Sequence, residues 1–332
     1  MSNIRHLLDQ YRKSPAVSQL AKALEPPNAR VQLSGLTGAQ VSFALAAVTK
    51  EIHHHLFIAN SKEEAAYLQN DLAGILSEQT IHFFPDSFKR PAFYDDLNPT
   101  QVLQRSETVN KITSPEGKGA SVMITYPEAL FEKVVSPDVL QKTRIDITKG
   151  EKLDVDFVIQ VLIEYDFERT DFVYEPGQFS IRGGIVDLFS YGNDLPYRIE
   201  LFDDEVESIR VFDPLTQLSK QNIARVSIVP NLNTRFRQDQ KVSLFRVLPP
   251  GTVLWIKDFQ FLLDRLQYCF EKAETFAGKL TALDPAELRE IFRDRAFLYP
   301  ADVMEDVQER SIVFLEGRME ALKKDFPGLF LF

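Results

Sequence analysis

The sequence predicts an α/β protein in which a smaller α+β domain, rich in strands, interrupts a parallel-sheet domain. Apolar runs of strand length alternate with helical periods over residues 30–125, the pattern of a parallel sheet covered by helices. Residues 166–212 instead carry short apolar runs separated by turn formers, as antiparallel strands do. The α/β alternation returns after Asp213. These changes divide the chain into residues 1–125, an inserted domain at 126–212 and a return segment at 213–332.

Composition favours a soluble protein of a reducing compartment. The 332 residues suggest two or three domains, because single cores stop growing at about 250 residues. Cys269, the one cysteine, lies among Leu266, Tyr268 and Phe270, which predicts a buried, inert thiol. The sequence has no apolar run of about 20 residues and no signal peptide, so we expect a cytoplasmic location without membrane contact.

Net charge excludes one class of function. The net charge of −10 and a pI near 5.2 argue against a chain that binds DNA strongly by itself, since phosphate neutralisation needs clustered lysine and arginine.

In the first segment, Ser14-Pro15 opens a helix, with a capping side chain before a proline. A later helix begins with the capping box Ser61 to Glu64. The remaining expected elements are strands at 30–33, 56–60, 81–84 and 121–125, helices near 39–49 and 102–112, and a proline- and aromatic-rich loop at 85–99.

The inserted domain contains the turn Gly183-Gly184, which should place Arg182 at a strand end, presented to solvent. We expect its helices at 128–133 and 155–165 and its strands at 144–148, 179–181, 185–189, 197–202 and 206–212. In the return segment, strands are expected at 225–229, 253–256 and 311–315, with a long helix from Asp258. An apolar strand begins at 328–332, where the chain stops, which suggests a fragment of a longer protein.

The turn from Gly35 to Ser42 follows a strand and precedes a helix, where phosphate-binding loops lie. Such a loop needs a lysine for the β- and γ-phosphates, and Val41 stands in its place. Gln40 replaces the last glycine, so that Gly35, Gly38 and the hydroxyl of Ser42 remain from the pattern. We therefore interpret the turn as a degenerate nucleotide loop kept as a helix entry.

Other motifs are weaker. The acidic run Ile199 to Glu205 resembles a strand with a magnesium-binding acidic pair, but the glutamate inside the strand and the return at Val206 favour a solvated turn. His53 to His55 precede a strand, and a surface loop is the favoured interpretation over a metal site. The sequence offers no credible catalytic constellation.

The arginines of the inserted domain are the stronger signal. Arginine beside aromatic residues is typical of interface anchors, because the guanidinium both stacks and forms directed hydrogen bonds. Ordinary pairing with carboxylates on the strand surface explains the same residues equally well. The arginines are Arg169, Arg182, Arg198 and Arg210, the aromatics Phe172, Tyr174, Phe179, Phe189 and Tyr191, and the carboxylates Glu168, Glu175, Asp187 and Glu200.

Two long runs, Glu175 to Phe189 and Tyr197 to Arg210, closely resemble the amino-terminal module of the bacterial transcription-repair coupling factor, Mfd. That module is itself similar to UvrB. Phe83 to Asp86 and Val211 to Gln217 extend the resemblance over nearly the whole chain. It implies a degenerate RecA-like domain in two segments, with an inserted domain of the type that binds UvrA.

The resemblance also implies site residues. Arg169 and Arg182 match arginines with which UvrB contacts UvrA, and Ser180 stands where UvrB has a further arginine. The aromatic DNA-clamping hairpin of UvrB is replaced by the shorter loop Pro91 to Asp96. The family places its ATP- and magnesium-dependent DNA translocase and its RNA-polymerase-binding domain farther along the chain, beyond Phe332.

Two functions follow as hypotheses. The first is a non-catalytic docking module, without cofactor or metal, that brings UvrA to stalled RNA polymerase in transcription-coupled nucleotide excision repair. The second is a UvrB-type ATP-dependent DNA helicase that uses the turn from Gly35 to Ser42.

Overall fold

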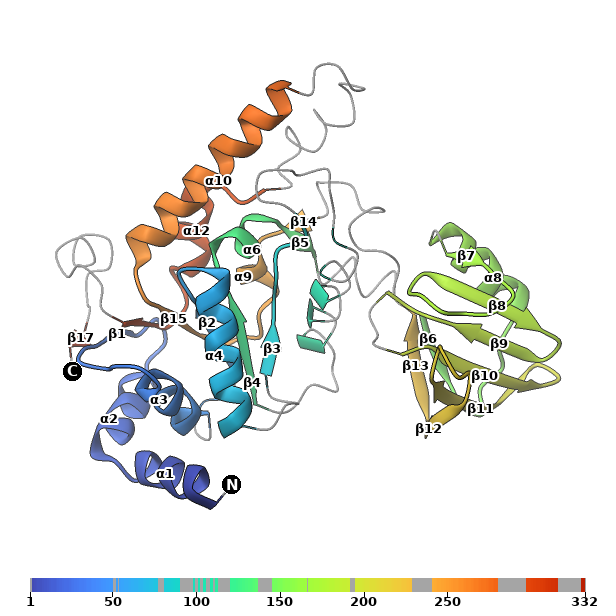
Figure 1. Ribbon diagram of the computed structural model, residues 1–332, viewed down its shortest axis with the longest axis horizontal. Coiled ribbons are helices and arrows are strands. Elements are labelled where there is room, and N and C mark those ends of the chain that lie inside the picture. The colour runs from blue at the N-terminus through green and yellow to red at the C-terminus, as the bar shows by residue number, and fades with distance from the viewer. Residues whose placement is uncertain are drawn as a thin grey trace. The chain divides into compact units, whose positions relative to one another are not determined.

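The computed structural model divides the chain into two compact units (Figure 1). Unit 1 comprises residues 1–101, 111–134 and 242–332, and unit 2 comprises residues 102–110 and 135–241. The structure describes residues 2–49, 52, 54–76, 81–89, 98, 101, 104–105, 108–109, 111–112, 120–136, 145–165, 167–191, 195–228, 241–279, 297–315 and 330–331.

Unit 1 is built on a seven-stranded sheet in the order β17-β1-β16-β15-β2-β4-β3. Every neighbouring pair is parallel. All residues of β15 and β16 are buried, as expected for strands covered on both faces. The predicted α/β class is therefore confirmed. The strands are β1 (Arg30–Leu33), β2 (His54–Ile58), β3 (Ile81–Phe83), β4 (Ser121–Thr125), β15 (Val253–Ile256), β16 (Ile312–Leu315) and β17 (Phe330–Leu331).

Helix α4 begins close to its predicted capping box. Ser61 accepts a hydrogen bond from the Glu64 amide at 3.2 Å, whereas Glu64 accepts from the Asn60 amide, one residue before the expected partner. Ser14 occupies the N-cap of α2, but its side chain makes no capping hydrogen bond, so that part of the prediction is wrong. The helices of unit 1 include α1 (Ser2–Arg12), α2 (Pro15–Ala23), α3 (Gln40–Val48), α4 (Lys62–Ile75), α6 (Pro127–Phe131), α9 (Leu244–Val247), α10 (Phe259–Lys279) and α12 (Pro300–Val307).

Arg30, at the start of β1, fixes the end of α12. Its guanidinium donates to the carbonyls of Gln308 at 2.8 Å and Val307 at 3.3 Å, and to that of Arg310. A cation at a helix carboxyl end satisfies carbonyls that lack partners in the helix and opposes the helix dipole. Burial lowers the pKa of Arg30 to about 10.

Two of the three histidines, His54 and His55, do not lie in a surface loop. His54 and His55 belong to β2, and His55 is buried. The indole of Trp255 donates to Nδ1 of His55 at 3.1 Å, and Nε2 lies 2.9 Å from the Ile52 carbonyl. Since Nδ1 accepts, Nε2 carries the proton and donates to that carbonyl. His55 is thus a core residue, and His53 lies outside the described residues.

Unit 2 contains a six-stranded sheet in the order β12-β11-β10-β9-β8-β7, drawn from green to yellow in Figure 1. A hairpin at Gly183-Gly184, with Gly183 at φ +59°, joins β8 to β9 as predicted. Helix α8 (Val155–Glu164) packs Val158 and Leu162 against this sheet in one buried cluster. The strands are β7 (Glu168–Arg169), β8 (Gln178–Arg182), β9 (Ile185–Leu188), β10 (Tyr197–Phe202), β11 (Glu205–Phe212) and β12 (Ser219–Ile223).

The inserted unit extends farther along the chain than residue 212. Strand β12 pairs with β11, and β13 (Arg225–Ile228) pairs antiparallel with β6 (Ile145–Thr148). The assignment of residues 225–229 to the return segment is therefore wrong, because that strand pairs with β6 in unit 2. The chain enters and leaves this unit at β5 (Val134–Val135) and β14 (Lys241–Val242), which pair with each other.

Two expected features lie mostly or wholly outside the described residues: the helix near 102–112 and the loop Pro91 to Asp96.

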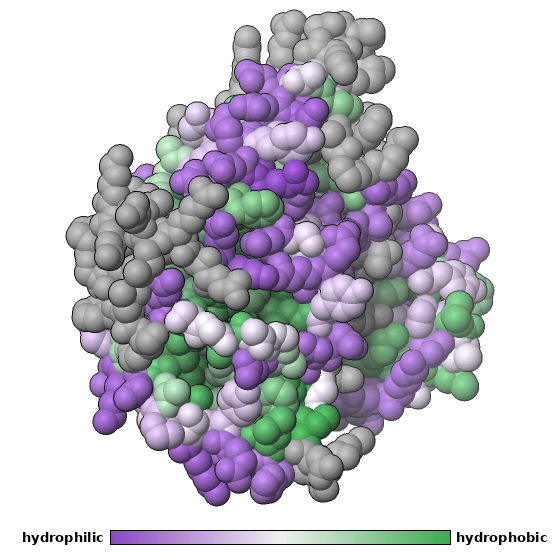
Figure 2. All heavy atoms as spheres, turned by 60° about the vertical axis from the view of Figure 1, so that its left-hand side comes forward, coloured by the Kyte–Doolittle hydropathy of each residue, from purple (hydrophilic) through white to green (hydrophobic). Residues whose placement is uncertain are grey.

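On the face that Figure 2 brings forward, hydrophilic side chains predominate and apolar ones gather in smaller patches between them. None of the described helices combines the length and apolar character that crossing a membrane requires.

Candidate functional site

The turn from Gly35 to Ser42 connects β1 to α3, as a phosphate-binding loop would. Gly35 and Gly38 adopt φ values of +77° and +55°, which only glycine takes without strain. The side chain of Gln40 folds back, and its Oε1 accepts a hydrogen bond from the Thr37 amide at 2.8 Å. An amide that would point at a phosphate is thereby satisfied within the turn.

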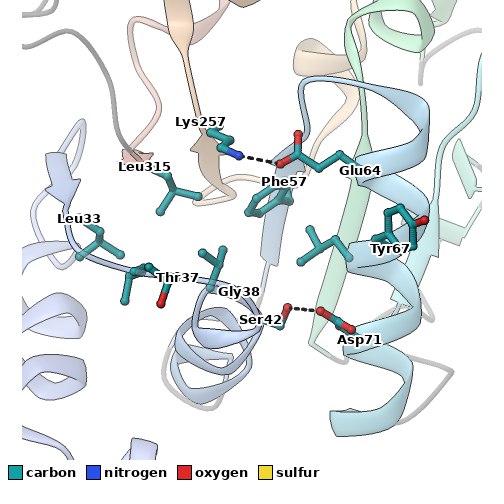
Figure 3. Close-up of a pocket in the computed structure, with 13 residues that line it drawn as sticks. Leu33, Thr37, Gly38, Ser42, Phe57, Glu64, Tyr67, Asp71, Lys257 and Leu315 are labelled. Atoms are coloured by element: carbon teal, nitrogen blue, oxygen red, sulfur yellow. Dashed lines mark hydrogen bonds and ion pairs between the residues drawn. The ribbon is translucent and has the colours of Figure 1, made fainter.

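A cavity of about 430 Å³ lies beside this turn, at the carboxyl ends of the strands (Figure 3). Val41 lies on its wall, at the position where a phosphate-binding loop has its lysine. Its apolar lining comes from the strand ends, the turn and one face of α4. The apolar lining residues are Leu33, Leu36, Val41, Phe57, Leu68 and Leu315.

The charges around the cavity do not suit a triphosphate. Lys257, its one lysine or arginine among the described residues, donates to Glu64 at 3.0 Å, as the dashed line in Figure 3 marks. The Ser42 hydroxyl donates to Asp71 at 3.4 Å. Among the described lining residues, two carboxylates and one paired cation leave no unpaired positive charge for phosphate oxygens. The geometry supports a degenerate loop.

Sequence reasoning missed Lys257, Glu64 and Asp71 as cavity residues. Lys257 directly follows β15, and ligands of parallel sheets bind at the carboxyl ends of strands, so its position was a usable signal. Glu64 and Asp71 project from α4, whose seven-residue spacing places them on the same side of the helix.

Two of the four arginines that the sequence analysis singles out, Arg198 and Arg210, are engaged inside unit 2. Arg198 donates to both oxygens of Asp187, at 2.7 and 2.8 Å, and is 17% exposed. Hydrogen bonding to Asp187 raises the pKa of Arg198. Arg210 forms an ion pair with Glu200 on the neighbouring strand. For these two, pairing within the sheet is the better interpretation.

Arg182 ends β8 and remains 40% exposed. It donates to Asp187 at 2.6 Å, so that this buried carboxylate is shared between two arginines. The guanidinium carbon also lies 4.9 Å from the ring centre of Phe172. Arg182 is therefore held in place yet accessible.

Arg169 lies on β7, the edge strand of the sheet, and its side chain is exposed. Among the described residues it has no hydrogen-bond or ion-pair partner. Register places it opposite Phe179, so Arg182 is three residues farther along β8, about 10 Å at the rise of a strand. Both arginines thus lie at the β7–β8 edge of unit 2, although an offset of three residues directs their side chains to opposite faces of the sheet.

The acidic run Ile199 to Glu205 forms a hairpin between β10 and β11, as the sequence predicts. Asp203 turns with φ +58°, and Asp204 pairs with Lys152 at 2.6 Å. Within the described part of the chain, the structure contains no group of three or more histidine, cysteine or acidic side chains that could hold a metal ion.

Comparison with known proteins gives concordant results. Residues 145–233 match the family described as UvrB interaction domain. The chain is 28% identical over 227 residues to the transcription-repair-coupling factor of Bacillus subtilis (strain 168), which covers 68% of this chain and 19% of that protein. It is 27% identical over 252 residues to UvrABC system protein B of Vibrio vulnificus (strain YJ016), covering 69% and 36%. The protein of that name from Serratia proteamaculans (strain 568) is 29% identical over 232 residues, covering 65% and 34%.

The resemblance to the coupling factor and to UvrB is thereby confirmed, and the family match falls on unit 2. The chain spans between 19% and 36% of the length of these relatives.

Proposed function

We propose that this chain is the UvrA-docking module of a transcription-repair coupling factor, acting in the cytoplasm in transcription-coupled nucleotide excision repair. The module recruits UvrA to stalled RNA polymerase and performs no catalysis itself. In this proposal, the ATP-driven DNA translocase and the contacts with RNA polymerase and double-stranded DNA belong to other parts of a longer protein. The module needs neither ATP nor magnesium.

One observation carries the proposal: the unit that matches the UvrB interaction domain presents Arg169 and Arg182 at one sheet edge. Exposed arginines with directed donors suit a protein partner that offers carboxylates. The cavity beside Gly35 supports the non-catalytic part, because its lysine is paired with Glu64.

The test is a calorimetric titration of purified UvrA into the protein and its variants. Arg169→Glu and Arg182→Gln should each abolish or strongly weaken binding, with melting temperatures close to that of the parent. Glutamine is chosen at 182 because a glutamate would face the buried carboxylate of Asp187. Unchanged affinity in both variants would remove the assignment.

Arg225→Gln is the matched control. Arg225 is 45% exposed and pairs with Asp146 at 2.6 Å, much as Arg182 pairs with Asp187, but it lies on β13, outside the β7–β8 edge. UvrA affinity should be retained in this variant.

A second candidate is a UvrB-type ATP-dependent helicase. The cavity at the Gly35 to Ser42 turn and the similarity to UvrABC system protein B favour it. Titration with Mg-ATP distinguishes the two proposals. Binding of ATP that is lost in Ser42→Ala would support the helicase, whereas we expect no binding by the unmodified chain.

A further inference from the structure

We propose that Phe172 and Tyr174 form the apolar anchor of the same docking surface, and that Asp187 positions Arg182 over Phe172. This inference rests on the proposed function and deepens it. The surface of UvrA that binds here then combines a carboxylate, for Arg182, with an apolar side chain that packs on the two aromatic rings.

The two rings lie close together and are about half exposed. Phe172 is 46% exposed and Tyr174 is 50% exposed, with ring centres 6.5 Å apart. Arg182 lies over the ring of Phe172 at 4.9 Å. Aromatic residues and arginine dominate binding energy at protein interfaces, and here all three occupy one surface.

The segment that carries the rings is fixed by hydrogen bonds from side chains outside it. The hydroxyl of Ser180 donates to the Asp171 carbonyl at 3.0 Å, and the amide of Gln217 donates to the Val173 carbonyl at 3.2 Å. Gln178 accepts from the backbone amides of Tyr174 at 2.9 Å and Glu175 at 3.1 Å. A surface held in its binding conformation loses little entropy when a partner binds.

Val173, between the two rings in sequence, holds the segment against the domain by burying its side chain. Its side chain is fully buried with Phe189 and Phe212 in a small cluster of its own. The chain therefore alternates an outward ring, an inward valine and an outward ring. This alternation exposes both aromatic rings to solvent while the buried valine keeps the backbone of the segment packed against the domain.

The charge balance leaves Arg182 available to a partner. Asp187 is 1% exposed, and Arg198 already satisfies both of its oxygens. Two arginines and one carboxylate give a net charge of +1 at this point, so Arg182 is oriented by Asp187 without being neutralised. Asp187 is thus a positioning residue.

Phe202 provides a matched control, because it is an exposed ring of the same unit that has no arginine over it among the described residues. It is 77% exposed at the end of β10, but its neighbours in the turn are Asp203 and Asp204. No described arginine lies over its ring.

The experiment measures the affinity of purified UvrA for Phe172→Ala, Tyr174→Ala and Phe202→Ala, with the melting temperature of each variant. Phe172→Ala and Tyr174→Ala should each weaken binding about tenfold or more, the usual effect of removing an interface anchor. Phe202→Ala should leave it unchanged. Equal affinity of all three and the parent would overturn the apolar anchor.

A double-mutant cycle tests the role of Asp187 separately from stability. Asp187→Asn should weaken UvrA binding in the parent and have no further effect in Arg182→Gln, because its contribution passes through Arg182. An undiminished effect of Asp187→Asn in the Arg182→Gln background would overturn the positioning role.

The arginine variants and the aromatic variants distinguish failure of the proposed function from failure of this inference. If Arg169→Glu and Arg182→Gln leave UvrA affinity unchanged, the proposed function and this inference both fall. If those arginine variants lose binding while Phe172→Ala and Tyr174→Ala keep it, the docking proposal stands and the aromatic anchor alone is overturned.

Discussion

Arg198 and Asp187 form a bidentate ion pair in unit 2: the guanidinium reaches both carboxylate oxygens, at 2.7 and 2.8 Å. The pair lies on neighbouring strands in direct register, and the guanidinium also covers the ring of Phe212 at 4.6 Å. Because Asp187 is buried, losing this partner should cost more folding free energy than the same loss would cost at an exposed carboxylate.

Arg198→Ala should therefore destabilise unit 2 strongly. Arg182 still contacts Oδ2 of Asp187 in this variant, but Oδ1 of the buried carboxylate loses its partner, and we expect a loss of about 3 kcal/mol in the free energy of unfolding. Urea unfolding followed by circular dichroism measures it. Arg210→Ala, which breaks a pair on the same sheet that is about 30% exposed, should cost less than about 1 kcal/mol. Similar losses in the two variants would contradict this account of Asp187.

The cap of α4 gives a second prediction. Ser61→Ala removes the acceptor for the Glu64 amide and should lower the free energy of unfolding by about 1 kcal/mol. Ser14→Ala is the control, because Ser14 also occupies an N-cap position but makes no capping hydrogen bond. The prediction fails if the two substitutions have the same effect in urea unfolding.

These two serines illustrate how far the sequence predicts the fold. Strand and helix positions follow from local patterns, and β1, β4, α4, α8 and the strands from β8 to β11 lie close to where those patterns place them. Whether a capping residue makes its bond depends on a rotamer that the pattern does not specify. Strand β12 escaped notice because four of its five residues are exposed and polar, so its place depends on pairing with β11.

Pairing between residues distant in sequence also explains why β13 is predicted in the return segment although it belongs to unit 2. Its strand was predicted at nearly the right residues, but pairing with β6, some eighty residues earlier, decides its unit. His55 is similar, since the indole that donates to its ring belongs to Trp255, 200 residues away.

For the candidate sites, the sequence shows which required side chain is absent, but it does not show which side chains pair with one another in the folded protein. Val41 in place of a lysine is visible in the sequence, whereas the pairing of Lys257 with Glu64 joins residues 193 positions apart. Likewise, Arg182 and its aromatic neighbours stand out by composition. That Asp187 holds two arginines at once depends on the register of β8, β9 and β10.

Cys269 should be unreactive in the folded protein. Its side chain is 6% exposed, and burial is the main cause that raises the pKa of the thiol to about 12. Because the thiolate is the nucleophile, Ellman's reagent at pH 8 should detect no thiol in the native protein and one per chain in urea. Release of one equivalent within minutes from the native protein would contradict the burial of this residue.

The turn after β11 predicts a pH dependence of stability. Asp213 accepts hydrogen bonds from the amides of Leu215 and Thr216, both at 3.0 Å, and pairs with Lys220 at 2.8 Å. The hydrogen bond with Lys220 is the largest cause that lowers the pKa of Asp213 from 3.8 to about 2, followed by the backbone amides. A folded-state pKa below the unfolded value means that the carboxylate stabilises the native state above pH 3.8, and that this contribution is lost as pH falls toward 2.

Asp213→Asn should accordingly be less stable than the parent at pH 7, with the difference shrinking as the pH falls from about 4 toward about 2, where the parent carboxyl also becomes neutral. Melting temperatures across this range measure the difference. Lys220→Met serves as the control: it should destabilise the parent at pH 7 but not the Asp213→Asn variant, because its partner charge is already absent. A gap between parent and Asp213→Asn that stays constant from pH 7 to the acid limit would show that the turn is held by its backbone alone.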